Sequence, residues 1–164
     1  MPLPSPTSLN LDLHLSAAGR PAASFARLWV SLWAQPYVPN ELLEMCRLTL
    51  ARLHRDEDEM AAGNPHLPAG IPSGERRALV LAGNTGDATF SAGERAVLEL
   101  AEVYGLDAQS ITDELAAKVA RALGELGLVF LIEALGCIDG RIRTARCLRD
   151  LSAAASAREA ARDV

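Results

Sequence analysis

The sequence contains few aromatic residues. They make up 4% of its 164 residues, whereas 49% of the residues are hydrophobic, mostly Leu, Ala and Val. Ala and Leu are strong helix formers, while β-strands favour aromatic and β-branched residues. The composition therefore predicts an all-α protein, and the length suits one domain with a core of its own.

Cysteine is also scarce, and the three cysteines are widely separated. Cys46, Cys137 and Cys147 form neither a dithiol motif nor a metal-binding motif. Free cysteine usually behaves as a small buried hydrophobic residue, so we expect all three in the core. The acidic residues match neither a calcium loop nor a zinc signature. The sequence predicts no metal and no other cofactor.

Basic stripes and long hydrophobic runs are absent as well. The net charge is −5, with Lys and Arg scattered among acids, which excludes a typical nucleic-acid-binding surface. The longest apolar run, residues 126–138, is shorter than the roughly 20 residues of a membrane-spanning helix, so no membrane partner is expected. Residues 1–6 lack the features of a signal peptide, and we expect a cytoplasmic protein.

Glu133 interrupts the apolar run 126–138. It should pair with an arginine or a hydroxyl, or lie at a subunit boundary, because an unpaired buried carboxylate is costly.

Proline, glycine and the apolar spacing divide the chain into three parts. Residues 1–22 contain four prolines and predict a flexible, helix-free arm. Residues 23–150 predict a domain of about six helices, and residues 151–164 a weakly helical tail. The predicted helices cover about 23–36, 40–62, 73–82, 91–104, 112–123 and 125–150.

Local signals support several of these boundaries. Ser91 and Glu94 form a capping-box pattern at the start of one helix, which Gly105 should end. Thr112 is a suitable N-cap for the next helix, and Gly124 predicts a break before the last one.

Three stretches of the chain, in this order, resemble one known family. They are residues 44–59, then Phe90-Ser91-Ala92-Gly93-Glu94-Arg95-Ala96-Val97-Leu98, and finally Ile138-Asp139-Gly140-Arg141-Ile142-Arg143. The sequence resembles the carboxymuconolactone decarboxylase and alkylhydroperoxidase AhpD-like superfamily of small helical proteins over residues 23–148. The resemblance implies an AhpD-like helical fold and a homo-oligomer, whether dimer, trimer or hexamer.

The chain departs from this family where the redox members carry a Cys-x-x-Cys pair. By the resemblance, Glu44 matches the glutamate of their proton relay, Asp56 and Glu59 occupy the two cysteine positions, and Gly63 occupies the histidine position. A carboxylate cannot pass through a sulfenic acid or a disulfide, so thiol peroxidase chemistry should be absent.

Other registers of the alignment lead to the same conclusion. They place His54 and Glu57, or Leu53 and Asp56, at the thiol positions, and none of them restores a cysteine pair.

The decarboxylase branch of the family suggests a function without thiols. By that resemblance, Glu44, His54, Asp56 and Glu59 form an acid–base cluster at a pocket for a small organic substrate. One member of a crowded set of carboxylates tends to retain its proton and can act as a general acid. The reaction would be a decarboxylation, an isomerisation or a cyclisation.

Two other interpretations remain open. The charged run Arg55 to Glu59 is typical of a solvated helix face, which would favour a non-catalytic binding or scaffold protein. A weaker alternative is a residual peroxidase that uses an isolated cysteine.

Overall fold

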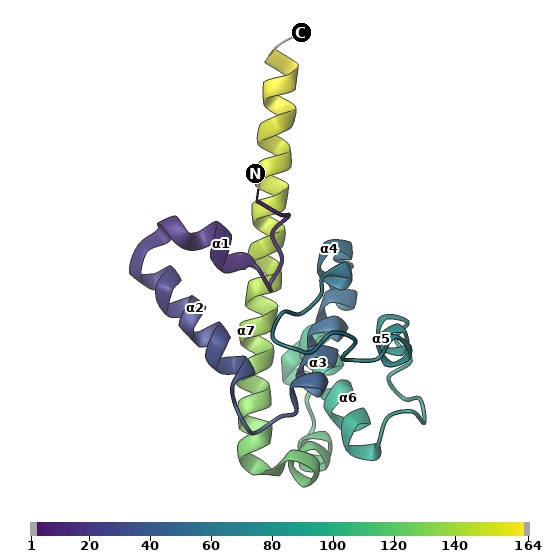
Figure 1. Cartoon of the computed structure of the whole chain (residues 1–164). Helices are drawn as coiled ribbons and strands as arrows, with labels where there is room; N and C mark the ends of the chain where they lie inside the picture. The colour runs from purple at the N-terminus through teal and green to yellow at the C-terminus, as the bar shows by residue number, and fades with distance from the viewer. Residues whose placement is uncertain (1–2, 163–164) are drawn as a thin grey trace.

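A computed structural model describes residues 3–162, and within that range the chain is helical and has no β-strand. The α-helices are α1 (Leu11–Leu15), α2 (Gly19–Trp33), α3 (Asn40–Leu53), α4 (Glu57–Ala61), α5 (Gly74–Leu81), α6 (Ala92–Asp107) and α7 (Asp113–Arg162). The long helix α7 runs the height of the molecule, with α1 and α2 on one side and α3 to α6 on the other (Figure 1). The predicted all-α class is confirmed.

Helix starts that depend on local capping follow the prediction. Ser91 and Glu94 form the capping box: the Glu94 backbone N–H donates to Ser91 Oγ at 3.2 Å, and the Ser91 N–H donates to Glu94 Oε2 at 2.8 Å. Thr112 Oγ1 accepts from the Leu115 N–H at 3.2 Å at the start of α7. Gly124, with φ of 79° and ψ of 166°, interrupts α7 as expected.

The prediction of one helix over residues 40–62 is wrong. Helix α3 ends at Leu53, Arg55 takes a positive φ of 52°, and a separate short helix α4 follows. Asp56 is the N-cap of α4, and its Oδ1 accepts from the Glu59 N–H at 3.1 Å. An aspartate side chain competes well with the helical backbone for such a bond, which explains the break.

The prediction of a helix-free N-terminal arm is also wrong, because residues 11–15 form α1 and α2 begins at Gly19. Pro21 lies in the first turn of α2, where its missing N–H costs no helical hydrogen bond. Residues 7–9 and Leu11 are buried.

The C-terminal tail to residue 162 continues α7 and projects beyond the rest of the molecule (Figure 1). Residues 1–2 and 163–164 lie outside the described range.

Helix α3 forms the centre of the core, since residues 42–51 are all buried. Trp29 and Trp33 are buried and pack edge to face against each other. Gly105 does not end α6. It instead allows close packing on α3, because a Cβ at this position would lie 2.6 Å from Leu53 Cδ1.

The apolar run 126–138 is only partly buried. Leu131, Leu135 and Ile138 are inaccessible, whereas Leu126, Val129 and Ile132 are exposed. Glu133 lies on the exposed side and makes no ion pair within the described residues, so the predicted buried pairing is wrong for the single chain. None of the described helices combines the length and apolar character needed to cross a membrane.

Candidate functional site

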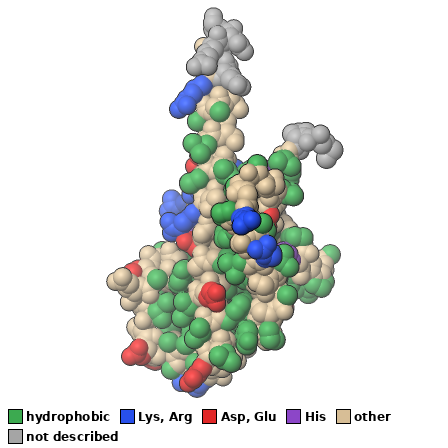
Figure 2. Space-filling model, turned by 90° about the vertical axis from the view of Figure 1, so that its left-hand side faces the viewer, with side chains coloured by type: hydrophobic (Ala, Val, Ile, Leu, Met, Phe, Trp, Pro, Cys, Tyr) green, Lys and Arg blue, Asp and Glu red, His purple; other side chains and the backbone are tan. Residues whose placement is uncertain are grey.

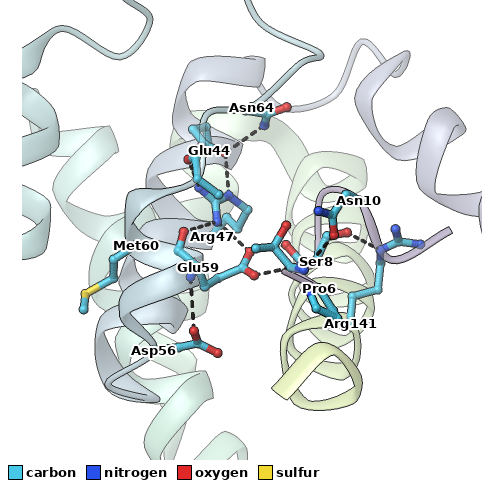
Figure 3. Close-up of polar contacts among 12 residues, drawn as sticks. Pro6, Ser8, Asn10, Glu44, Arg47, Asp56, Glu59, Met60, Asn64 and Arg141 are labelled. Carbon is cyan, nitrogen blue, oxygen red and sulfur yellow. Dashed lines mark hydrogen bonds and ion pairs between the residues drawn. The ribbon is translucent and has the colours of Figure 1, made fainter. Parts of the chain in front are cut away.

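Glu44 of α3 and Glu59 of α4 meet at a buried arginine, Arg47. Arg47 Nη2 lies 2.7 Å from Glu44 Oε1, and its Nε donates to Glu44 Oε2 at 2.8 Å. Its Nη1 donates to Glu59 Oε1 at 2.6 Å and to the Glu59 carbonyl at 2.9 Å. The three side chains are at most 1% exposed, and Figure 3 shows Arg47 between the two carboxylates. Because the chain breaks before α4, Glu59 lies beside Arg47.

Glu44 also borders a cavity of about 390 Å³ beneath the loop between α4 and α5. Asn64 Nδ2 donates to Glu44 Oε2 at 2.7 Å, and Arg77 Nη1 lies 3.9 Å from Glu44 Oε1. Gly63, Asn64 and Arg77 line the same cavity, together with the proline-rich segment from Pro65 to Pro72. This cavity places a carboxylate, an amide and a guanidinium around one space.

On the other side of the cluster, Glu59 binds the N-terminal segment. The Ser8 backbone N–H donates to Glu59 Oε2 at 2.7 Å, and the Ser8 hydroxyl donates to Glu59 Oε1. The Ser8 carbonyl accepts from Nε of Arg141 on α7 at 2.7 Å. Ser8 thus lies between a buried carboxylate and a buried guanidinium, as Figure 3 shows.

Asp56 is directed to a different partner. Its Oδ2 pairs with Arg149 Nη2 on α7, while its Oδ1 caps α4. Asp56 and Glu59 are buried, so the solvated-face interpretation is wrong for these two residues. It is correct for Arg55, Glu57 and Asp58, which are exposed.

His54 is separate from the Glu44 cavity as well. Its Nε2 lies 2.5 Å from Asp139 Oδ1 on α7, and Asp139 Oδ2 accepts from Arg143 at 2.7 Å. The structure therefore joins Glu44 and Glu59 through Arg47 and gives Asp56 and His54 their own partners on α7.

The sequence suggested that Glu44 and Glu59 repel each other, but in the structure both carboxylates pair with Arg47. Burial by itself would lower the pKa of Arg47, but its hydrogen bonds and charge attraction to Glu44 and Glu59 raise that pKa above its usual value. The pKa of Arg77 is lowered by its burial and by the positive charge of Arg47, against an opposing effect of Glu44. Arg47 is thus fixed as a cation between two carboxylates, and the idea of a general acid created by crowding has no geometric support.

Sequence reasoning missed the two buried arginines, Arg47 and Arg141. Both occur on helices, and each is fully buried. Arg47 lies three residues after Glu44, which is a helical ion-pair spacing, and that spacing was the available signal. Arg141 has no such local partner, because its carboxylate partner is Asp12.

The cysteines lie in different environments, and the prediction that all three occupy the core is wrong. Cys46 is buried, Cys137 is partly buried and Cys147 is exposed. Burial, followed by the charge of Glu44, raises the pKa of the Cys46 thiol to about 12. Burial also raises the pKa of Cys137. These two thiols are therefore poor nucleophiles at neutral pH.

Searches against protein-family models, curated proteins and solved structures give no match to this chain. Within residues 3–162, no group of three or more potential His, Cys, Asp or Glu ligands converges on a point where a metal ion would fit.

Proposed function

We propose that the chain is a non-redox, AhpD-like protein of the carboxymuconolactone decarboxylase type, which catalyses proton transfer on a small organic metabolite in the cavity beside Glu44. The supporting observation is the position of the Glu44 carboxylate, which is held by Arg47 and Asn64 at the wall of a 390 Å³ cavity that also contains Arg77. A cavity of this size suits a small metabolite.

The hydrogen bonds of Glu44 suit a general base. Its Oε2 accepts from both Arg47 and Asn64, whereas Oε1 accepts a single hydrogen bond, from Arg47. A carboxylate oxygen has two lone pairs, so Oε1 retains one for a substrate proton. Arg77, near the same oxygen, would stabilise the anion left on the substrate. Decarboxylation, isomerisation and cyclisation can all involve such a step.

The other predicted site residues take supporting roles in this proposal. Glu59 holds the far side of Arg47 and so fixes the orientation of Glu44. Asp56 caps α4 and pairs with Arg149, which positions Glu59. His54 would not contact the substrate. Its role would be to stabilise the structure around the site through its pair with Asp139.

A non-catalytic binding or scaffold protein is the second candidate, and one observation favours it. Glu44, Asp56 and Glu59 are each paired with an arginine within the described structure. Fully paired buried charges are also what a purely structural network contains.

Hydrogen–deuterium exchange into substrate carbon distinguishes the two functions. The protein is incubated in D₂O with a panel of small lactones and keto acids, and NMR follows deuterium incorporation. We expect Glu44→Gln to slow the exchange by about 10²- to 10⁴-fold, the usual contribution of a general base. The matched control Glu57→Gln, at an exposed position of α4, should leave it unchanged. Exchange no faster than without protein for every compound would favour the scaffold, and equal accelerated rates in Glu44→Gln and the parent protein would contradict the role of Glu44 as the base.

The proposed homo-oligomer would use the exposed apolar face of α2 and α7. Val30, Leu126 and Val129 are 57%, 71% and 64% exposed. Hydrophobic side chains gather on the lower half of the face in Figure 2, around the level of α2 and the first part of α7. We expect light scattering to give more than one chain per particle, and Val129→Lys to reduce that mass, with Leu151→Lys on the projecting end of α7 as the control. A monomeric parent protein would contradict this assembly.

A further inference from the structure

Arg141 forms a carboxylate clamp on the side of α7 that faces the N-terminal segment. Its guanidinium carbon lies 4.3 Å from the centre of the Trp29 ring and 5.1 Å from that of Phe25. Stacking of this kind uses the face of the guanidinium and leaves its N–H edges free for hydrogen bonds. The side chain is fully buried. Two aromatic residues therefore hold the arginine in a fixed orientation.

The clamp is occupied by a residue of the chain itself. Arg141 Nη1 and Nη2 lie 2.9 and 3.0 Å from the two carboxylate oxygens of Asp12. This is the bidentate geometry with which arginine binds free carboxylates. Asp12 is 30% exposed although Arg141 is inaccessible, so the carboxylate enters the clamp from the solvent side.

Ser8 supplies a second set of polar groups to the same region. It presents an N–H and a hydroxyl to Glu59 and a carbonyl to Arg141. The segment 7–12, which we call the occupying segment, thus offers a carboxylate and hydrogen-bond donors to two buried charges of opposite sign. A small hydroxy acid offers the same combination.

The occupying segment does not fill all the space around it. A cavity of about 440 Å³ separates residues of this segment, including Thr7, Leu9 and Asn10, from Ala61 to Gly63 and Pro65. The segment therefore has open volume on one side into which it can move.

We propose that the occupying segment is a built-in competitor for a binding site that takes a small organic hydroxycarboxylate, with the ligand carboxylate on Arg141 in place of Asp12 and its hydroxyl on Glu59 in place of Ser8. This site is distinct from the Glu44 cavity and goes beyond the proposed function. Its test measures binding and not turnover, so it can succeed or fail independently of catalysis.

Malate and succinate serve as probes, and tryptophan fluorescence serves as the signal. The chain has two tryptophans, and Trp29 stacks on Arg141 while Trp33 packs against Trp29. Asp12→Asn keeps the shape of the side chain and removes its charge. We expect this variant to bind malate about tenfold or more tightly than the parent protein, because a weaker competitor leaves the site open more often. The control Asp150→Asn, at an exposed position of α7, should bind like the parent.

Two further comparisons locate the site. Succinate, which lacks the hydroxyl, should bind Asp12→Asn more weakly than malate does. Adding Arg141→Lys to Asp12→Asn should abolish malate binding, because lysine keeps the charge and loses the bidentate fork. Equal malate affinity in the parent and Asp12→Asn, no binding to either, or binding that survives Arg141→Lys would overturn the proposal.

Hydrogen exchange provides a test that does not depend on the folding of the Arg141 variant. The Ser8 N–H is hydrogen-bonded to Glu59 and should exchange slowly in the parent protein. Saturating Asp12→Asn with malate should accelerate exchange in residues 7–12. Malate binding that leaves the exchange of this segment unchanged would show that the ligand binds elsewhere and would overturn the proposal.

Discussion

At the scale of single residues, Arg47 stabilises the fold because it neutralises two buried carboxylates. Arg47→Met would leave Glu44 and Glu59 without this partner. We expect a loss of about 3–5 kcal/mol in the free energy of unfolding, the usual effect of breaking a buried ion pair from one side. Urea denaturation measures it. Arg20→Met, at an exposed position of α2, should change stability by less than about 0.5 kcal/mol. Similar losses in the two variants would show that the Arg47 network contributes little.

The cysteines should differ sharply in reactivity. Cys147 is exposed, whereas burial raises the pKa of Cys46 to about 12 and also raises that of Cys137. We expect a thiol reagent at pH 8 to modify Cys147 first in the native protein and to reach Cys46 only after unfolding. Mass spectrometry of the modified peptides identifies each site. Rapid native modification of Cys46 would revive the residual peroxidase alternative.

His66 should make the fold less stable in mild acid. Burial, and then the positive charge of Arg141, lower its pKa from 6.5 in the folded protein, with an opposing effect of Asp12. The unfolded chain therefore binds the proton more readily, so stability is lost as the pH falls through the unfolded value of 6.5 and regained above it. Urea midpoints at pH 7.5 and 5.5 should differ less in His66→Phe, which keeps a ring to stack on Trp33. An unchanged difference would show that another group causes it.

At the scale of elements, two glycines in helices should respond in opposite ways to alanine. A Cβ at Gly105 of α6 would lie 2.6 Å from Leu53 Cδ1 and 2.8 Å from Leu50 Cδ2, whereas a Cβ at Gly140 of α7 has no neighbour within 4 Å. We expect Gly105→Ala to destabilise the protein by about 1–3 kcal/mol through overpacking. Gly140→Ala should stabilise it by about 0.5–1 kcal/mol through helix propensity. Thermal unfolding compares the two, and a stabilised Gly105→Ala would contradict the close packing of α6 on α3.

The elements that the sequence predicted well depend on nearby residues. The capping box at Ser91, the N-cap at Thr112 and the break at Gly124 each involve residues a few positions apart. The break between α3 and α4 was missed because a helical continuation and an Asp56 cap compete closely, and the pair with Arg149 favours the cap. The helix α1 was missed because its burial depends on contacts with distant parts of the chain.

The candidate site shows the same limit. The family resemblance brought Glu44 and Glu59 to attention, and the structure places both on Arg47. The partners of Asp56 and His54 lie 93 and 85 positions away, on α7. Pattern and spacing along the sequence contain no information about such partners, so the grouping of the four residues could not be decided before the fold was known.

At the scale of the whole molecule, the projecting end of α7 should be dispensable for the fold. The side chains of residues 151–158 are exposed, and Figure 1 shows this part of α7 beyond the other helices. A single helix in water without tertiary contacts is marginally stable. We expect that a chain ending at Asp150 has a free energy of unfolding within about 0.5 kcal/mol of that of the parent protein. Circular dichroism follows the transition, and a large loss of stability would indicate that this end packs against another chain.

The occupying segment also has a consequence for the order of events during synthesis. Ser8 emerges from the ribosome long before Arg141, which follows it by 133 positions. At a synthesis rate of about 5–20 residues per second, the occupying segment is made several seconds or more before that arginine. Glu59, 51 positions after Ser8, is available much earlier. The segment can therefore contact Glu59 well before it can contact Arg141, so its two buried partners become available one after the other.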